Sequence, residues 1–276
     1  PWLPLGVPRP NRTRPRPPPV PATTLTRFCL VIHYDGAGLH GWQLQPDVPT
    51  VQGELEAVLE RISGKRRPVI ASGRTDSGVH ATGQVAVVDL PGARWTPRRL
   101  RGALNGLLPS GIWIERVHEV APDFHPRFDA RARTYRYHVG TSPLAASPFH
   151  RRWCWPLDEE LELAIMVRGA EMLVGDHSFR AFAKAGQPER GYRCTVLRTV
   201  WTPWDELGLT FTITANRYLH HMVRYLVGTL VDIGRGRRPV EDIAELLEGK
   251  GRGVVTSPPA PPEGLFLSRV DYADTP

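Results

Sequence analysis

The hydrophobic positions between residue 26 and about residue 120 switch between two spacings. Residues 28–34 are apolar and β-branched and are followed by Asp35-Gly36, which is typical of a strand that ends in a turn. After Thr50, apolar residues recur every three or four positions until Gly64, which predicts a capped helix. The same criteria predict strands at 68–71, 84–90 and 112–120, and a helix that begins at Thr96-Pro97 and ends before Pro109.

A second set of mixed elements occupies residues 122–276. Strands are expected at 134–139, 195–202, 207–214 and 265–272, and helices after Asp158, from Leu219 to Gly234 and over 239–247. This order is too irregular for a Rossmann fold or a barrel. We therefore predict an α+β fold of two similar mixed units, each an antiparallel sheet with helices on one face, with an active-site cleft between them.

Residues 1–25 differ in composition from the rest of the chain. Nine of the first 21 residues are proline, four arginines are interspersed, and no acid occurs before Asp35. Such a segment cannot bury enough apolar surface to fold, so we expect a disordered tail that either contacts a polyanion or is a non-essential extension. The predicted division is then a tail at 1–25, an N-terminal α+β domain at 26–121 and a C-terminal α+β domain at 122–276.

The formal net charge of +7 says little about the folded part. Residues 1–25 carry four arginines and no acid, so the remaining residues have a net charge of only +3. Three residues are lysine, and all other strong bases are arginine. This bias fits either recognition of phosphates by guanidinium groups or a GC-rich coding sequence. Net charge bears on association with a partner and does not determine the fold.

Three cysteines, Cys29, Cys154 and Cys194, are widely spaced and form no C-x-x-C motif. This pattern argues against a disulfide framework and a thiolate zinc site, and it favours a reducing compartment. No apolar run approaches the roughly 18–20 residues that span a bilayer, and the first residues lack the pattern of a signal peptide. We therefore expect a cytoplasmic protein that does not enter a membrane.

The segment 71–84, between two predicted strands, has the most unusual composition of the chain. Asp76-Ser77-Gly78 is typical of a turn that exposes its acid. Arg74 lies two residues earlier, so it shares a side with Asp76 if the strand continues, and it would keep the carboxylate ionised and oriented. Two interpretations remain open: a nucleophilic or basic carboxylate, and an ordinary hairpin turn with a local ion pair. The glycine spacing matches neither a P-loop nor a dinucleotide-binding motif.

Residues 74–81, Arg-Thr-Asp-Ser-Gly-Val-His-Ala, closely resemble the signature loop of the TruA-type tRNA pseudouridine synthase family. Other segments resemble that family in the same order, and the resemblance runs from about Phe28 to Tyr272. These segments are 33–36, 41–45, 51–52, 105–109, 123–128, 133–137, 220–224 and 263–267.

The resemblance implies an isomerase that converts uridine to pseudouridine in tRNA. The N1–C1′ bond breaks, the uracil turns, and C5 bonds to C1′, so neither a redox cofactor nor a phosphate donor is required. Asp76 occupies the position of the family's nucleophilic aspartate, and whether it attacks the base or the ribose remains open. Carboxylate nucleophiles divide a difficult step into two easier ones.

Further roles follow from the same resemblance. Arg74 is expected to help evert the target nucleotide, which costs a few kcal/mol of lost stacking. Tyr135 is expected to stack on the target base, and its hydroxyl is a candidate for removing the C5 proton. Arg224 is expected to pair with Asp76, and Leu265 to form an apolar wall of the uracil pocket. His80 is expected either to stabilise the loop or to face the RNA.

The resemblance also implies a substrate and an assembly. Bacterial members of this family act at positions 38, 39 and 40 of the anticodon stem-loop and resemble homodimers, so we expect tRNA and a second copy as partners. Arginines at 98, 99 and 101 and at 235, 237 and 238 are candidate RNA contacts. We expect no metal, because adjacent residues such as His220 and His221 point about 100° apart on a helix.

Three alternative functions remain open. They are a tRNA-binding protein or folding chaperone with the same fold, a pseudouridine synthase with a different target site, and a base-processing glycosidase. A glycosidase would release free uracil, whereas the isomerase releases none.

Overall fold

The computed structural model describes residues 24–184, 191–248 and 253–273 of the 276-residue chain. The predicted tail therefore lies almost entirely outside the described residues. The α-helices of the described part are α1 (Val51–Ser63), α2 (Pro97–Asn105), α3 (Leu163–Glu171), α4 (Met222–Gly234) and α5 (Asp242–Glu248). Its strands are β1 (Leu25–Tyr34), β2 (Ile70–Ala71), β3 (His80–Pro91), β4 (Ile112–Val120), β5 (Ala132–Gly140), β6 (Trp155–Pro156), β7 (Gly175–Ser178), β8 (Arg193–Trp204), β9 (Gly208–Ala215) and β10 (Leu265–Asp271).

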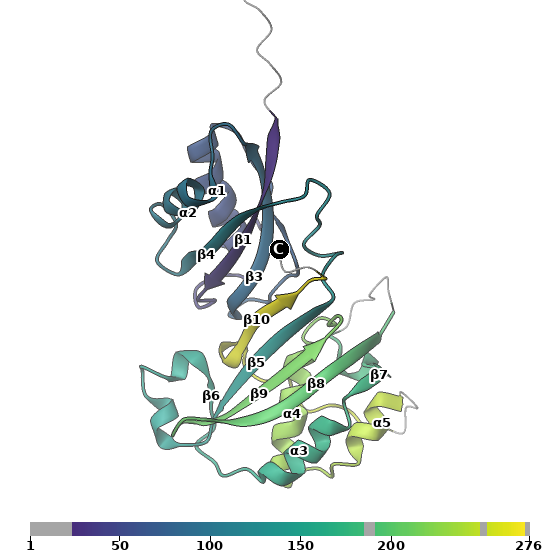
Figure 1. Cartoon of the computed structure of the whole chain (residues 1–276). Helices are drawn as coiled ribbons and strands as arrows, with labels where there is room; N and C mark the ends of the chain where they lie inside the picture. Colours follow the sequence, from purple (N-terminus) through teal and green to yellow (C-terminus); the bar gives the residue numbers. More distant parts are fainter. Residues whose placement is uncertain (1–23, 185–190, 249–252, 274–276) are drawn as a thin grey trace, which may run out of the picture.

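All ten strands belong to one sheet, whose main path runs β4-β1-β3-β10-β5-β9-β8-β7 (Figure 1). The pairs within each half of the path are antiparallel, as expected for the two units. The last strand, β10, lies in the middle of the sheet, where it pairs in parallel with β3 and antiparallel with β5. The α+β prediction is confirmed, and β10 joins the two expected sheets into one. The boundary at residue 121 stays a prediction.

The two halves have separate hydrophobic cores on the same face of the sheet. Leu267 packs into the core of the first half, together with α1 and α2, whereas Leu265 packs into the core of the second half. These residues are two positions apart on β10, so their side chains point to the same face. The helices of both halves therefore cover one face of a continuous sheet (Figure 1).

Capping residues explain why the first two helices match their predicted positions. The Thr50 hydroxyl accepts a hydrogen bond from the Gly53 N–H at the start of α1, and Gly64 ends the helix in the left-handed conformation. Thr96 caps α2 in the same way, with Pro97 in the first turn. The predicted cap at Asp158 is wrong: its φ of 52° takes the chain out of a helical path, and α3 begins at Leu163.

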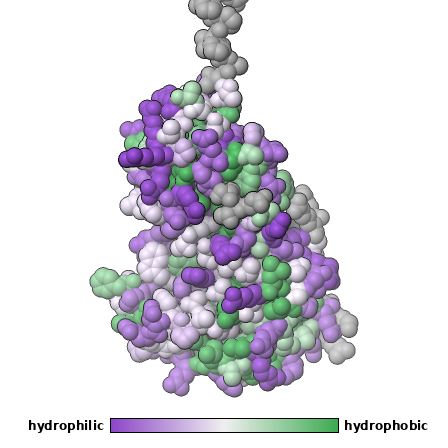
Figure 2. All heavy atoms as spheres, viewed as in Figure 1, coloured by the Kyte–Doolittle hydropathy of each residue, from purple (hydrophilic) through white to green (hydrophobic). Residues whose placement is uncertain are grey.

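The three cysteines are free and buried, and burial raises the pKa of Cys29 to about 12 and that of Cys194 to about 11. None of the helices in the described ranges is long and apolar enough to cross a membrane. On the face seen in Figure 2, hydrophobic residues are interspersed with hydrophilic ones over both halves of the molecule.

Candidate active site

The loop between β2 and β3, residues 72–79, is held by the segment that follows β1. The Trp42 N–H donates to the Thr75 carbonyl at 3.1 Å, and the hydroxyls of Tyr34 and Thr75 are 2.7 Å apart. A side chain at Gly41 would place its Cβ 2.6 Å from the Thr75 oxygen, so this approach requires glycine. The loop is therefore fixed by its backbone and by the Thr75 hydroxyl, and these contacts do not involve Arg74 or Asp76.

Asp76 lies in this loop, and its side chain is 26% exposed. The Nε2 atom of His220 is 3.3 Å from Oδ1 of Asp76, and the Nε2 atom of His221 is 3.5 Å from Oδ2. Both histidines belong to the segment between β9 and α4. The carboxylate of the first half of the chain thus meets two side chains of the second half, as the predicted position of the active site requires.

The backbone at His221 explains how two adjacent histidines reach one carboxylate. The predicted start of the long helix at Leu219 is wrong: α4 begins at Met222, and His221 has a left-handed φ of 62°. The two imidazoles are consequently not arranged as on a helix, and their ring centroids are only 4.3 Å apart. The sequence predicts a regular helix over both residues, which argued against a shared metal, and neither was among the predicted site residues.

Arg224 does not form the expected ion pair with Asp76. Its Nε donates to the Ala260 carbonyl at 2.7 Å, and the Ala260 N–H donates back to the Arg224 carbonyl at 2.9 Å. Within the described residues, the ion-pair partners of Asp76 are the two histidines. Arg224 lies one helical turn beyond them. Burial lowers the pKa of His221, the charge of Asp76 opposes this effect, and the charge of Arg224 lowers the pKa further.

Arg74 is exposed and makes no ion pair with Asp76. The predicted local ion pair is therefore wrong, because Asp76 turns toward the histidines of the second half. The guanidinium of Arg74 remains accessible beside the carboxylate, where it is free to contact a ligand.

Tyr135 lies at the centre of the sheet, on β5 opposite Leu267 of β10. Its ring packs edge-on against Tyr218, with 4.8 Å between the centroids. Burial raises the pKa of Tyr135 well above its ordinary value of 10, and the nearby Tyr34 and Asp76 raise it further. The hydroxyl therefore keeps its proton at neutral pH, and Tyr135 lies close enough to Asp76 to respond to its charge.

His80 does not face solvent: its side chain is 1% exposed. Its Nδ1 accepts a hydrogen bond from the Gly36 N–H at 2.9 Å, and its ring stacks on Phe266 of β10. Burial lowers the pKa of His80, so the imidazole stays neutral. The structure agrees with the loop-stabilising interpretation and argues against the RNA-facing one, because the ring cannot reach a bound substrate.

Leu265 is buried at the start of β10, opposite Tyr137 of β5. Tyr137 and Tyr135 are two positions apart on β5 and share a face, so Leu265 lies on the same face of the sheet as Tyr135. This placement is compatible with an apolar wall for a uracil, and that role stays a prediction.

The carboxylate of Asp76 and the two imidazoles also form a possible metal-ligand set. Their ligand atoms lie within 4.8 Å of one another, and carboxylate and imidazole groups are both ligands of Zn²⁺. The argument from helical spacing against a metal therefore does not apply to His220 and His221, since they are not on a helix.

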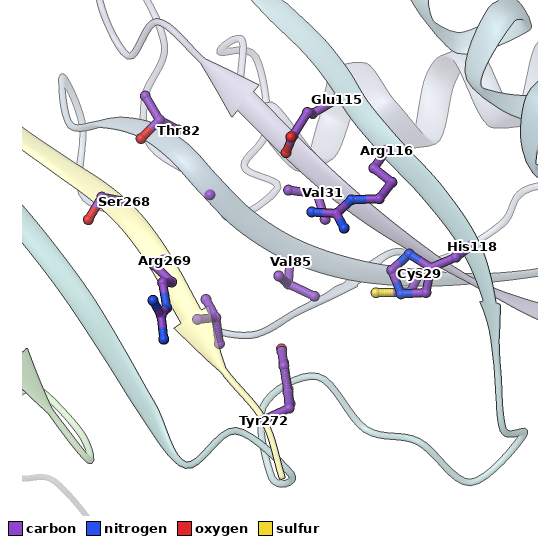
Figure 3. A pocket seen from close by; sticks show the side chains of 12 residues that line it. Cys29, Val31, Thr82, Val85, Glu115, Arg116, His118, Ser268, Arg269 and Tyr272 are labelled. Atoms are coloured by element: carbon purple, nitrogen blue, oxygen red, sulfur yellow. The ribbon is translucent and has the colours of Figure 1, made fainter. Parts of the chain in front are cut away.

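A hollow of about 180 Å³ lies elsewhere, and residues along β1, β3, β4 and β10 line it (Figure 3). Its lining includes Cys29, Val85, His118 and Tyr272, and none of the predicted site residues contributes to it. Val85 and Cys29 belong to a small core apart from those that the helices cover. The hollow is therefore distinct from the candidate active site.

Several of the arginines that follow α4 are already paired with acids. Arg235 binds Glu159 at 2.6 Å, and Arg238 binds Asp242 at 2.6 Å. These guanidinium groups are less available for phosphates than the sequence suggests, because each already contacts a carboxylate.

Comparison with known proteins identifies the family of this chain. The model of the tRNA pseudouridine synthase family matches residues 30–129 and 170–273. The chain belongs to this family, and its members are isomerases that act on RNA.

Two of its relatives are both called tRNA pseudouridine synthase A. The one from Moorella thermoacetica is 40% identical over 88% of this chain and 98% of its own length. The one from Listeria welshimeri is 40% identical over 90% of this chain and its full length. A solved Cbf5-Nop10-Gar1 complex aligns with 89% of this chain and 59% of its own chain, at 10% identity and a TM-score of 0.32, which is too weak a similarity to support an argument.

Proposed function

We propose that this protein isomerises uridine to pseudouridine at positions 38, 39 and 40 of the anticodon stem-loop of tRNA, with Asp76 as the nucleophile. The observation that carries the proposal is the contact of Asp76 with the histidine pair, because it brings a partly exposed carboxylate of one half against side chains of the other. Tyr135 lies near enough for the charge of Asp76 to raise its pKa. The two relatives named above are tRNA-modifying enzymes by name, which supports tRNA as the substrate.

The chemistry needs few parts. The carboxylate of Asp76 forms a bond to the base or to the ribose, and the N1–C1′ bond breaks. The uracil turns, C5 bonds to C1′, and the bond to Asp76 breaks again. C5 then loses its proton and N1 gains one. The number of atoms and electrons is unchanged, so the reaction consumes no oxidant or reductant. A nucleophile on a fixed loop suits this role, since covalent catalysis depends on a reacting atom that is already in place.

The neighbouring residues take supporting roles. The ring of Tyr135 stacks on the uracil. Burial disfavours the phenolate, so the hydroxyl can accept the C5 proton only if another group takes the phenolic proton at the same time. The exposed Arg74 is placed to enter the space that an everted nucleotide leaves. Arg224 acts on Asp76 indirectly, through the histidines and the segment at Ala260.

The central test is a comparison of purified wild type with Asp76→Asn, an isosteric change that removes the nucleophilic charge. We expect pseudouridine formation in tRNA transcripts to fall below detection, while tRNA affinity stays within a few-fold of wild type. Asp123→Asn, at an exposed position outside the site, is the matched control and should keep full activity. Equal product yield from Asp76→Asn and wild type would overturn the proposal.

Two further experiments separate the alternatives. Transcripts in which the uridines at positions 38, 39 and 40 are replaced one at a time by cytidine should each lose the corresponding product. Modification at other positions would indicate a different target site. A strain that carries Asp76→Asn and still corrects a deletion phenotype would favour the tRNA-binding or chaperone function, and release of free uracil would favour a glycosidase.

We also propose that the protein acts in the cytoplasm as a homodimer. Light scattering of the purified protein tests the second point: a mass near twice 30.8 kDa is expected, and a monomeric mass would contradict it.

A further inference from the structure

The segment between β9 and α4 is fixed at several points, so its two histidines are held in place. The Tyr218 hydroxyl lies within hydrogen-bond distance of two carbonyls, those of Ile213 and Arg133, which share its single proton. The Lys184 N–H donates to the His220 carbonyl at 3.0 Å. The next residue, Leu219, is buried in the core of the second half. The orientation of the two imidazoles is therefore set by the surrounding structure.

The left-handed conformation of His221 adds a second observation. Four non-glycine residues of the described part have positive φ; three are aspartates, which tolerate this region, and the fourth is His221. Such a conformation is strained for a residue with a side chain and tends to persist at functional sites. Here it turns the imidazole toward Asp76 in place of continuing the helix.

The chemical nature of the two partners matters for a nucleophile. A guanidinium that binds both oxygens of a carboxylate makes strong, charge-assisted bonds, and these stabilise the anion against attack on another atom. An imidazole instead brings one ring nitrogen to one carboxylate oxygen, so each ring can orient a single oxygen without binding both. The contacts of 3.3 and 3.5 Å are long, as is common at catalytic sites without substrate.

We propose that His220 and His221 are positioning residues, each of which orients one oxygen of the Asp76 carboxylate, in the place where an arginine was expected. This inference rests on the proposed function of Asp76. His221 is the more important of the two, because its side chain is 16% exposed and its backbone is constrained, whereas that of His220 is 54% exposed.

The test is steady-state kinetics of His221→Ala, His221→Gln and His220→Ala with a tRNA transcript. We expect His221→Ala to lower kcat on the order of 100-fold with little change in KM, as for other losses of orientation at a reacting group. His221→Gln keeps an N–H donor and should recover part of this loss. His220→Ala should have a smaller effect. The matched control is His177→Ala. His177 lies on β7, where its ring contacts the Val174 carbonyl, and this variant should behave as wild type.

Chemical rescue distinguishes positioning from a merely structural role. Free imidazole added to His221→Ala should restore part of kcat, and it should restore nothing to Asp76→Asn. A rise in KM with unchanged kcat would identify His221 as an RNA contact and overturn the proposal. Wild-type activity in all three histidine variants, with an inactive Asp76→Asn, would overturn it and leave the proposed function intact.

A further experiment tests whether Asp76 and the two histidines bind a metal ion instead. Wild-type activity should be unaffected by EDTA and should be inhibited by added Zn²⁺, which would compete for the Asp76 carboxylate. Loss of activity with EDTA and its recovery with Zn²⁺ would mean that the histidines hold a metal, and would overturn the proposed role.

Discussion

The structure defines the protonation state of the Tyr135 hydroxyl, which lies near the proposed chemistry. Its pKa lies well above the ordinary value, mainly because the side chain is buried, so it is a phenol throughout the pH range of an assay. Its ring is also held edge-on against Tyr218. The aromatic ring and the hydroxyl of Tyr135 therefore make separable contributions to activity.

At this residue we predict different effects for two substitutions. Tyr135→Phe keeps the ring and should lower kcat by about 100-fold with little change in KM, a usual size for the loss of one proton-transfer group. Tyr135→Leu loses the stacking face as well, so its KM should also rise. Steady-state kinetics on one tRNA transcript measures both. A Tyr135→Phe variant with wild-type kcat would limit Tyr135 to stacking.

At the scale of elements, the site loop depends on the close approach of the turn after β1. The ideal Cβ of an alanine at Gly36 would lie 2.3 Å from the Val79 carbonyl oxygen, a backbone atom that cannot easily move aside. The Gly36 N–H also binds the buried His80 ring. The turn and the loop are thus packed backbone against backbone.

We predict that Gly36→Ala displaces the loop and lowers kcat. It should also lower the free energy of unfolding by on the order of 2 kcal/mol, as expected for an overpacked site. Gly73→Ala is the matched control, since Gly73 belongs to the same loop, has an ordinary φ and would place an added Cβ more than 4 Å from any neighbouring atom. Urea denaturation and the tRNA assay measure the two effects. Equal free energies of unfolding for the two variants would contradict the prediction, because they would show that the turn accommodates the added methyl group.

At the scale of the whole molecule, buried titratable groups determine how stability depends on pH. Burial raises the pKa of Tyr34 to about 12 and that of Cys154 to about 11, so the unfolded chain releases these protons first as the pH rises. Burial, with smaller effects of Arg136 and His80, lowers the pKa of His138 to about 4. The unfolded chain therefore binds a proton there first as the pH falls.

These signs predict maximal stability between about pH 6.5 and 9. Above pH 9 the folded state holds more protons than the unfolded state, so stability falls as pH rises toward 12. Between pH 6.5 and 4 the unfolded state binds more protons than the folded state, so stability falls as the pH drops. Tm measured from pH 4 to 11 checks both limbs, and His138→Phe should have a shallower acid limb. A Tm that is constant over this range would contradict the prediction.

The sequence predicts the elements whose signals are local. The Thr50 and Thr96 caps, the Gly64 end of α1 and the bounds of β4 agree with the structure because each depends on a few adjacent residues. The central place of β10 could not be predicted, since its pairing with β3 joins residues that are far apart in sequence. The histidine pair was missed for a different reason: the positive φ at His221 keeps residues 219–221 out of the helix that the spacing of Leu219 and Met222 predicts.

The central place of β10 has a consequence for how the protein is made. Its strand order puts residues 265–271 between β3 and β5, which are complete more than a hundred residues earlier. During synthesis, both halves must therefore wait with an unpaired strand edge each until β10 has left the ribosome. Exposed edges of this kind favour association with other chains. The nascent enzyme should accordingly be most prone to aggregate in the interval just before its last strand is translated.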